Sequence, residues 1–147
     1  MELIRQDTDY TMRALVHLAA HRDSGPIAAK VLAGACDIPE DFAYKILQKL
    51  SKAGIVESHM GVQGGFVLAR DPQEISLLEV VEVVQGPVAV RRCLLGKEEA
   101  CPRHPSCPVA AKLGGLQDVI VTSLKNMTLA EIVAAAYPSG TRAAAST

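Results

Sequence analysis

The stretch DIPEDFAYKILQKLSKAGIVESHMGVQGGFVLA, residues 37–69, changes its hydrophobic period near Gly54. Before this glycine, apolar residues recur every three or four positions, which predicts a helix with one apolar stripe. After it, two short runs rich in β-forming residues, 55–59 and 66–69, flank a glycine-rich connection. We therefore predict a helix followed directly by a β-hairpin. The predicted stripe of the helix consists of Phe42, Ile46, Leu47 and Leu50.

Helical patterns also flank this unit on both sides. Residues 9–22 and 28–36 carry apolar side chains at helical spacing, and the helix-stop sequence DSGP separates them. Downstream, SLLE at residues 76–79 is a predicted capping box. Further helices are predicted over residues 77–85, over 108–126 and from Thr128 onward. The predicted fold class is mostly α with one small β-hairpin, an α+β protein.

The bulk composition limits the class of protein. With 147 residues the chain has the length of one domain, and its net charge of −1 provides no general attraction for nucleic acids or anionic lipids. Charged residues occur at the N-terminus, where a signal peptide needs an apolar run, and no apolar stretch approaches the ~20 residues of a membrane helix. We expect a soluble, cytoplasmic protein without a membrane segment.

Three helices followed by a hairpin, in this order and at these lengths, are typical of a winged helix-turn-helix. In that fold the third helix enters the major groove of DNA, and the hairpin lies along the backbone or the minor groove. The alternative is a small α+β domain whose amphipathic helix faces solvent. Local charge does not separate the two readings, because the three lysines within residues 40–60 are balanced by three carboxylates.

If the third helix binds DNA, its polar side chains divide by chemistry. A carboxylate such as Asp41 can accept a hydrogen bond from a cytosine amino group, and an amide such as Gln48 can pair with adenine. The candidates for contact with base edges are Asp41, Tyr44, Lys45 and Gln48. The candidates for contact with phosphates, which would make affinity depend on salt, are Lys49, Lys52, His59 and Gln63.

A second feature is the segment CLLGKEEACPRHPSCP, residues 93–108, which holds three of the four cysteines. Thiolates on one segment select iron–sulfur clusters, zinc or Cu(I), and structural disulfides are rare in the cytoplasm. Basic residues outnumber acidic ones around this loop, which favours thiolates and an anionic cluster. We expect Cys93, Cys101 and Cys107 to be metal ligands. The alternatives are reduced thiols without a metal, or a redox disulfide with one thiol left over.

A tetrahedral metal or a cluster needs a fourth ligand. His104 lies between two of these cysteines and would complete a Cys3His zinc site, although a loop histidine more often faces solvent. Cys36, in the second predicted helix, is more typical of a small buried thiol. An enzyme with Cys101 or Cys107 as its nucleophile beside His104 would also need an oxyanion hole or a cofactor motif. The sequence shows neither, so we do not expect an enzyme.

Several segments follow one another in a specific order: TDYTMRAL at 8–15, IPEDFAYKILQKLSKAGIVES at 38–58, GVQGGFVLAR at 61–70, ISLLEVVEVVQG at 75–86, and the three-cysteine loop. In this order, over residues 1–135, the chain resembles the winged-helix transcription regulators that include the iron–sulfur regulator IscR, the nitric-oxide-sensing repressor NsrR and the cysteine-metabolism repressor CymR. The resemblance implies a homodimer that binds pseudo-palindromic operators in double-stranded DNA.

The resemblance also bears on the fourth ligand. IscR-type members place a histidine three residues after the last cysteine, where this chain has Ala110. NsrR-like members carry an aspartate in a TDY sequence that reaches the cluster of the other subunit, and the matching residue here is Asp9. The implied cofactor is an iron–sulfur cluster, with 4Fe–4S favoured over 2Fe–2S. One departure concerns the hairpin, because members of this group often place an arginine where this chain has Met60.

These features predict a DNA-binding transcriptional regulator, a repressor, whose operator affinity is controlled by an iron–sulfur cluster that senses nitric oxide, oxygen or redox state, or iron–sulfur status. The alternative is a cluster-free winged-helix regulator of cysteine or sulfur metabolism that uses zinc or its thiols. The predicted parts are the winged helix-turn-helix at 1–86, the cluster-binding loop at 87–107, the dimerisation helix and C-terminal helix at 108–136, and a disordered tail at 137–147.

Overall fold

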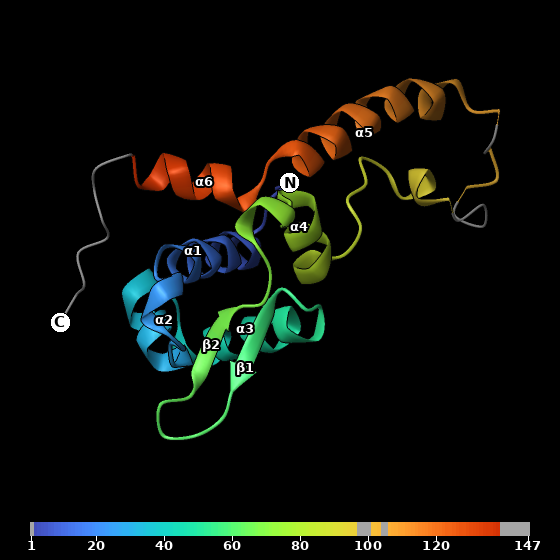
Figure 1. The fold of residues 1–147 in the computed structure, drawn as a ribbon. Helices are drawn as coiled ribbons and strands as arrows, with labels where there is room; N and C mark the ends of the chain where they lie inside the picture. Colours follow the sequence, from blue (N-terminus) through green and yellow to red (C-terminus); the bar gives the residue numbers. More distant parts are fainter. Residues whose placement is uncertain (1, 97–100, 104–105, 139–147) are drawn as a thin grey trace.

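The computed structural model describes residues 2–96, 101–103 and 106–138 (Figure 1). Its α-helices are α1 (Gln6–Ala20), α2 (Ala29–Cys36), α3 (Glu40–Lys52), α4 (Leu77–Gln85), α5 (Pro108–Asn126) and α6 (Leu129–Ala136). Two antiparallel strands, β1 (Val56–His59) and β2 (Gly65–Leu68), form a hairpin. Short 3-10 turns are η1 (Arg22–Ser24), η2 (Pro72–Glu74) and η3 (Arg92–Leu95). The predicted fold class is confirmed, whereas most of the predicted disordered tail lies outside the described residues.

One hydrophobic core unites helices α1 to α4, the hairpin and α6. Helix α1 packs against α2, α3, α4 and α6 within it (Figure 1). The predicted start of this helix at residue 9 was three residues too late, because Asp7 and Asp9 lie in its first turn, where the positive end of the helix dipole favours acids. The largest of the fully buried side chains in this core are Leu15, Leu32, Leu47, Leu50, Ile55, Ile75 and Leu129.

The hairpin is tied to the helices through the segment that precedes α2. Ile27 and Phe66 exchange two backbone hydrogen bonds of 2.8 and 3.0 Å, so Ile27 acts as a one-residue strand beside β2. The neighbouring Gly65 has a φ of +155° and lies so close to this segment that an added Cβ would overlap the Ile27 carbonyl group. The hairpin therefore has a defined position relative to α2 and α3.

The capping box predicted at the start of α4 forms only in part. The Ser76 hydroxyl accepts a hydrogen bond of 3.2 Å from the backbone N–H of Glu79, as predicted. The Glu79 carboxylate, however, accepts two hydrogen bonds of 2.6 and 3.1 Å from the guanidinium of Arg70. This ion pair joins the end of the hairpin to α4. A complete capping box occurs at the start of α6, between Thr128 and Glu131.

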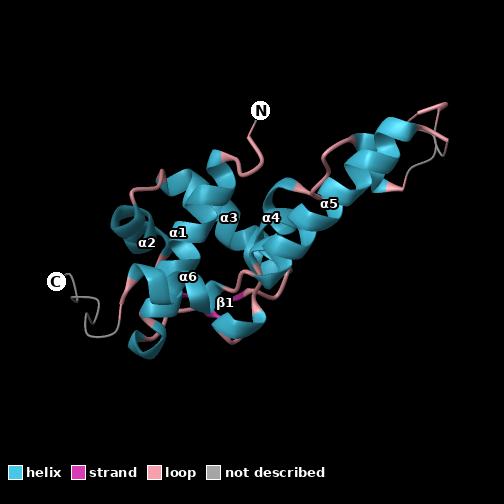
Figure 2. Cartoon of the chain, turned by 90° about the horizontal axis from the view of Figure 1, so that it is seen from above, coloured by secondary structure: helices cyan, strands magenta, loops and turns pink. Residues whose placement is uncertain are grey.

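Helix α5 projects away from the body of the molecule (Figures 1 and 2). Its C-terminal half packs on the body through a second small cluster, in which Leu124 meets Val81 and Val88. The segment between α4 and α5 runs outward beside the N-terminal half of α5, as the yellow and orange ribbons in Figure 1 show. The 3-10 turn η3, which contains Cys93, and the start of α5 therefore lie at the projecting end of the molecule, away from α2 (Figure 1).

Candidate DNA-binding face and thiol site

Helix α3 presents an apolar face to the core and a polar face to solvent. In the predicted stripe, Ile46, Leu47 and Leu50 are buried, and Phe42 is half-buried. The Phe42 ring meets the Tyr10 ring edge-on, with 5.5 Å between their centroids, which fixes the first turn of α3 against α1. Because an α-helix turns once in about 3.6 residues, the intervening positions face outward.

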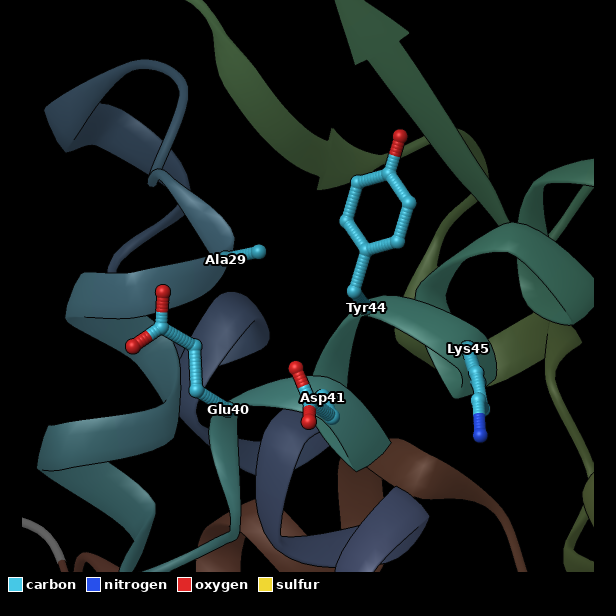
Figure 3. Close-up of a pocket in the computed structure, with 5 residues that line it drawn as sticks. All are labelled: Ala29, Glu40, Asp41, Tyr44 and Lys45. Atoms are coloured by element: carbon cyan, nitrogen blue, oxygen red, sulfur yellow. The ribbon is translucent and has the colours of Figure 1, made fainter.

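All four side chains predicted to contact base edges are exposed on this outward face: Asp41, Tyr44, Lys45 and Gln48. Three of them, with Ala29 and Glu40, line a hollow of about 400 Å³ between the start of α2 and α3 (Figure 3). In Figure 3 the Tyr44 hydroxyl points towards the hairpin, the Glu40 carboxylate lies near Ala29, and the Lys45 ammonium points away from both. The face is uneven and combines a carboxylate, a phenol, an ammonium and an amide.

A second hollow of about 310 Å³ separates α3 from the hairpin. Its lining residues are Tyr44, Gln48, Ser51, Lys52, Ser58 and Phe66. Tyr44 lines both hollows and so belongs to both surfaces. Lys52, predicted to contact a phosphate, thus shares a surface with the base-contact candidates Tyr44 and Gln48.

The other three predicted phosphate contacts differ in their surroundings. His59 and Gln63 are exposed on the hairpin, and His59 Nε2 lies 3.4 Å from the carboxylate of Glu57. The Lys49 ammonium instead donates a hydrogen bond of 3.3 Å to the carbonyl of Val84 near the end of α4. A cation is favourable there because the helix dipole is negative at its C-terminus. Lys49 therefore has a structural role that residue spacing did not predict.

The tip of the hairpin is apolar and exposed. Met60 is 95% exposed and Val62 is fully exposed. Between them, Gly61 has a φ of +113°, a value that non-glycine residues rarely adopt. The departure noted at Met60 thus places a thioether, and not a guanidinium, at the tip of the hairpin.

Two of the three loop cysteines line one cavity. Cys93 lies in η3, and it shares a cavity of about 560 Å³ with Cys101. Arg91 and Arg92 contribute to the same cavity wall. Both thiols are free and partly buried. The cavity therefore offers two soft donors beside two guanidinium groups.

Cys107 occupies the N-cap position of α5. Because Pro108 has no N–H, the first available amide donors of the helix belong to Val109 and Ala110. The nearby backbone N–H groups of Ala110 and Val109 lower the pKa of the Cys107 thiol most, burial opposes them, and the charges of Arg103 and Arg91 lower it a little further. The Cys107 thiol therefore ionises more readily than an ordinary cysteine thiol.

In the described part of the chain, no three histidine, cysteine, aspartate or glutamate side chains lie close enough together to hold one metal ion. The three thiols are therefore not preassembled as a site within one copy of the chain. Their chemistry nevertheless fits a thiolate-ligated metal: all are reduced, two share a cavity and arginines lie near them.

The candidates for a fourth ligand have different surroundings. Asp9 lies on the exposed side of α1, where its carboxylate pairs with the Arg13 guanidinium at 2.7 Å. Its expected role in the other subunit of a dimer stays a prediction. Cys36 lies in α2, where its thiol is 3.6 Å from the carbonyl of Arg13 and burial raises its pKa. Ala110 is buried in α5, and His104 lies outside the described residues.

The sequence analysis missed Gln117. Its side-chain N–H donates a hydrogen bond of 2.6 Å to the carbonyl of Val88, and its side-chain oxygen accepts one of 2.7 Å from the N–H of Val90. Gln117 lies seven residues from both Ala110 and Leu124, which are buried on the same side of α5. A glutamine at heptad spacing between two apolar residues was the available signal.

Another side of α5 is apolar but faces solvent. Val109 is 62%, Leu116 49% and Val119 61% exposed in the single chain. These residues lie at helical spacing on the part of the helix that projects from the body (Figure 2). Exposed apolar residues that continue along one helix are characteristic of a protein–protein contact.

In the described part of the chain, no helix is both long and apolar enough to cross a membrane.

Comparison with known proteins agrees with this architecture. The model of the Rrf2 family, described as an iron-dependent transcriptional regulator, matches residues 4–135. The protein aau3 of Rhizobium meliloti is 34% identical over 135 residues, which are 92% of this chain and 86% of that protein. The transcriptional regulator NsrR of Bacillus subtilis is 29% identical over 126 residues, 86% of each chain.

Two solved structures of regulators share the fold. IscR of T. potens aligns with a TM-score of 0.73 at 24% identity, over 94% of this chain and 90% of that one. CymR, the global cysteine regulator of B. subtilis, aligns with a TM-score of 0.74 at 24% identity, over 92% of this chain and 98% of that one. The expectation that the chain is not an enzyme is confirmed by these regulators. The match over almost the whole length, with the winged arrangement of α1 to α4 and the hairpin, establishes that the chain belongs to the Rrf2 family of transcriptional regulators.

Proposed function

We propose that this regulator is a cytoplasmic homodimeric repressor whose affinity for a pseudo-palindromic operator depends on an iron–sulfur cluster. Cys93, Cys101 and Cys107 of one subunit hold the cluster, and Asp9 of the other subunit supplies the remaining ligand. A 4Fe–4S cluster is favoured over 2Fe–2S. The observation that carries the proposal is the set of three reduced thiols near arginines, with Cys93 and Cys101 around one cavity and Cys107 at the start of α5, where its pKa is lowered.

The DNA-binding part of the proposal rests on the outward face of α3. Base-edge contacts are assigned to Asp41, Tyr44, Lys45 and Gln48, which share that face. Phosphate contacts are assigned to Lys52 beside them and to His59 and Gln63 on the hairpin, with a smaller contribution from Lys49 because its ammonium also binds the end of α4. A helix placed this way would enter the major groove, with the hairpin over the adjacent backbone.

The dimer is assigned to α5. Burial of the exposed side chains of Val109, Leu116 and Val119 against a second copy would remove apolar surface from water. Two copies joined through α5 would present two α3 helices to two half-sites about one turn of DNA apart, as in other dimeric helix-turn-helix proteins. The same dimer would be needed to bring Asp9 of one copy to the thiols of the other.

An iron–sulfur cluster supplies sensitivity to nitric oxide, oxygen and iron supply, because these agents disrupt its iron–ligand bonds. The residues of the chain translate occupancy into DNA affinity. When the thiols and Asp9 are held together, the loop of one subunit is joined to α1 of the other. Tyr10 of α1 packs on Phe42 of α3, so a shift of α1 would also move the DNA-binding helix. Since both half-sites must fit together, a small rotation between subunits lowers affinity.

The proposal is tested first by purification without oxygen. Visible absorbance together with iron and acid-labile sulfide supports it, and the ratio of iron to protein separates 4Fe–4S from 2Fe–2S. Operator binding by the cluster-loaded and cluster-free proteins is then measured at one salt concentration. Cys93→Ala, Cys101→Ala and Cys107→Ala are each expected to abolish cluster retention, and Asp9→Ala to weaken it, with Cys36→Ala as the matched control. Equal operator affinity with and without the cluster would eliminate the switch.

A second candidate is a cluster-free regulator of sulfur metabolism that holds zinc or reacts through its thiols. The lowered pKa of Cys107 favours reaction with oxidants, and the structural likeness to CymR concerns the fold alone. Oxygen-free protein that is colourless and contains zinc, or that contains neither metal nor sulfide and cannot be reconstituted with iron and sulfide, would support this candidate over the first.

A further inference from the structure

We propose that Gln117 is a positioning residue for the thiol site, because its side chain holds the first residues of the cysteine loop against α5. The inference deepens the proposed function and rests on it for its consequence, but the contact itself can be tested without a metal. Gln117 touches none of the three cysteines in the described structure; it acts through the backbone of residues 88–90.

The contact has the pattern of a β-bridge made by a side chain. The carboxamide of Gln117 donates to the carbonyl of Val88 at 2.6 Å and accepts from the N–H of Val90 at 2.7 Å. Both distances are short for N–H···O hydrogen bonds. Two bonds from one planar group to the peptide on either side of Ala89 restrict both the distance and the orientation of this segment relative to α5.

Packing alone does not explain why a glutamine stands at this position of α5. Ala110 and Leu124, one heptad before and after it, are both buried and apolar. Gln117 is half-buried between them, so its amide loses part of its contact with water and gains from hydrogen bonds within the protein. If only packing mattered, a leucine or methionine of similar size would serve better. The polar side chain is therefore explained by the two backbone groups that it binds.

The clamped segment is also a wall of the thiol cavity. Ala89 and Val90 line the cavity that contains Cys93 and Cys101. Cys107, at the other end of the loop, is the N-cap of α5. Gln117 and Cys107 are ten residues apart on α5, about 15 Å along its axis. Both ends of the loop are thus attached to the same helix, α5. This attachment limits the distances that the three thiols can have from one another.

Two substitutions separate the hydrogen bonds from the size of the side chain. Gln117→Met keeps the length and removes both hydrogen bonds. Gln117→Glu keeps the acceptor for the Val90 N–H but loses the donor to the Val88 carbonyl until the carboxyl group is protonated. The matched control is Asp118→Asn, a change of similar size at the exposed neighbouring position on α5. Thermal unfolding of each variant shows whether the fold is retained.

The first measurement is amide hydrogen exchange of Val90 in the metal-free, full-length protein. The clamp predicts slow exchange in the parent protein and exchange on the order of 10–100-fold faster in Gln117→Met, the size expected when both hydrogen bonds are lost. In Gln117→Glu, exchange corrected for its intrinsic pH dependence is expected to slow again as the pH falls through the titration of the new carboxyl group. An unprotected Val90 amide in the parent protein would overturn the inference, whatever metal the protein holds.

The second measurement is the rate at which a chelator removes iron from the oxygen-free, loaded protein. Residues that orient metal ligands typically change metal affinity by about 10–100-fold, so Gln117→Met is expected to shorten the lifetime of the site by that order. Asp118→Asn should leave it unchanged. A protected Val90 amide with an unchanged lifetime in Gln117→Met would reject the positioning role. Failure of the parent protein to bind iron would instead reject the proposed function, and amide exchange would still decide the clamp.

Discussion

The thiol of Cys107 faces the N–H groups of Val109 and Ala110, and these contacts separate it chemically from Cys36. Cys36 is half-buried in α2, where burial raises the pKa of its thiol. At Cys107 the helix donors and nearby arginines lower the pKa instead. The two residues have the same side chain, so their difference comes entirely from the position of each within the fold.

This difference predicts different pH profiles for alkylation. A lowered pKa keeps the thiolate present at lower pH, and the thiolate is the reactive form, so Cys107 should react at lower pH than Cys36. The measurement is the iodoacetamide reaction rate against pH, in metal-free proteins that retain only one of these two cysteines. Arg103→Ala should move the Cys107 profile to higher pH and leave the Cys36 profile in place. Coincident profiles for the two thiols would contradict the assignment.

Gly65 is the residue at which backbone conformation matters most for the hairpin. Gly65→Ala would place a methyl group against the Ile27 carbonyl at a φ of +155°, so we expect a loss of about 2–3 kcal/mol in the free energy of unfolding. The matched control is Gly34→Ala in α2, where there is open space and the helix favours alanine, with an expected gain of about 0.5–1 kcal/mol. Urea unfolding at one protein concentration measures both. Equal stabilities of the two variants would show that the Ile27–Phe66 bridge is not a constraint.

At the scale of the element, α3 combines one buried stripe with one mixed polar face. The stripe was predictable because burial follows the helical period. The face was also predictable in outline, since the remaining positions must point outward. The surroundings of its lysines were not predictable in this way. Lys52 lines the hollow beside the hairpin, whereas Lys49 binds the carbonyl of Val84.

For α3 we expect two kinds of effect on operator binding. Gln48→Ala should cost about 1–3 kcal/mol and relax the preference for one base pair, because an amide reads a base edge. Lys52→Ala should weaken binding to all sequences similarly and reduce the slope of log affinity against log salt by about 1. Lys125→Ala, on the exposed side of α5, is the control. Binding measured over a salt series with a set of operator variants distinguishes these outcomes, and identical behaviour of the two α3 variants would refute the division.

At the scale of the whole molecule, the chain consists of a packed body and a projecting arm formed by α5 and the cysteine loop (Figures 1 and 2). The body has the large core, and the arm meets it through Val81, Val88 and Leu124. An arm of this kind leaves apolar side chains of α5 without cover in the single chain. A second copy would supply that cover.

The dimer proposal predicts a strong effect of charge on this part of α5. Leu116→Asp combined with Val119→Asp should convert the protein to monomers, because two carboxylates would have to be buried in an apolar contact. Operator affinity should fall by about 100-fold or more, since the two half-sites would no longer be bound jointly. Sedimentation and operator titration measure these effects, with Asp118→Asn as the control. A double variant that remains dimeric would show that the subunits meet elsewhere.

Short-range features by themselves determined most of the fold. Helical period, the glycine at the end of α3, the two short β-runs and the Thr128 cap each involve residues that are close in sequence, so the elements they predict agree with the structure to within three residues. The same holds for the identity of the loop thiols and for the exposed face of α3. The order of these elements was already specific enough for the family, which the comparisons establish.

The tertiary structure alone decided which hydrogen-bond partners several polar side chains have. Glu79 binds Arg70 nine residues away rather than completing its own capping box, Lys49 reaches a carbonyl 35 residues away, and Gln117 clamps backbone groups 27 and 29 residues away. Each side chain also had solvent as an available partner. The choice depends on which elements pack together and at what angle, and neither quantity is contained in the spacing of residues along the chain.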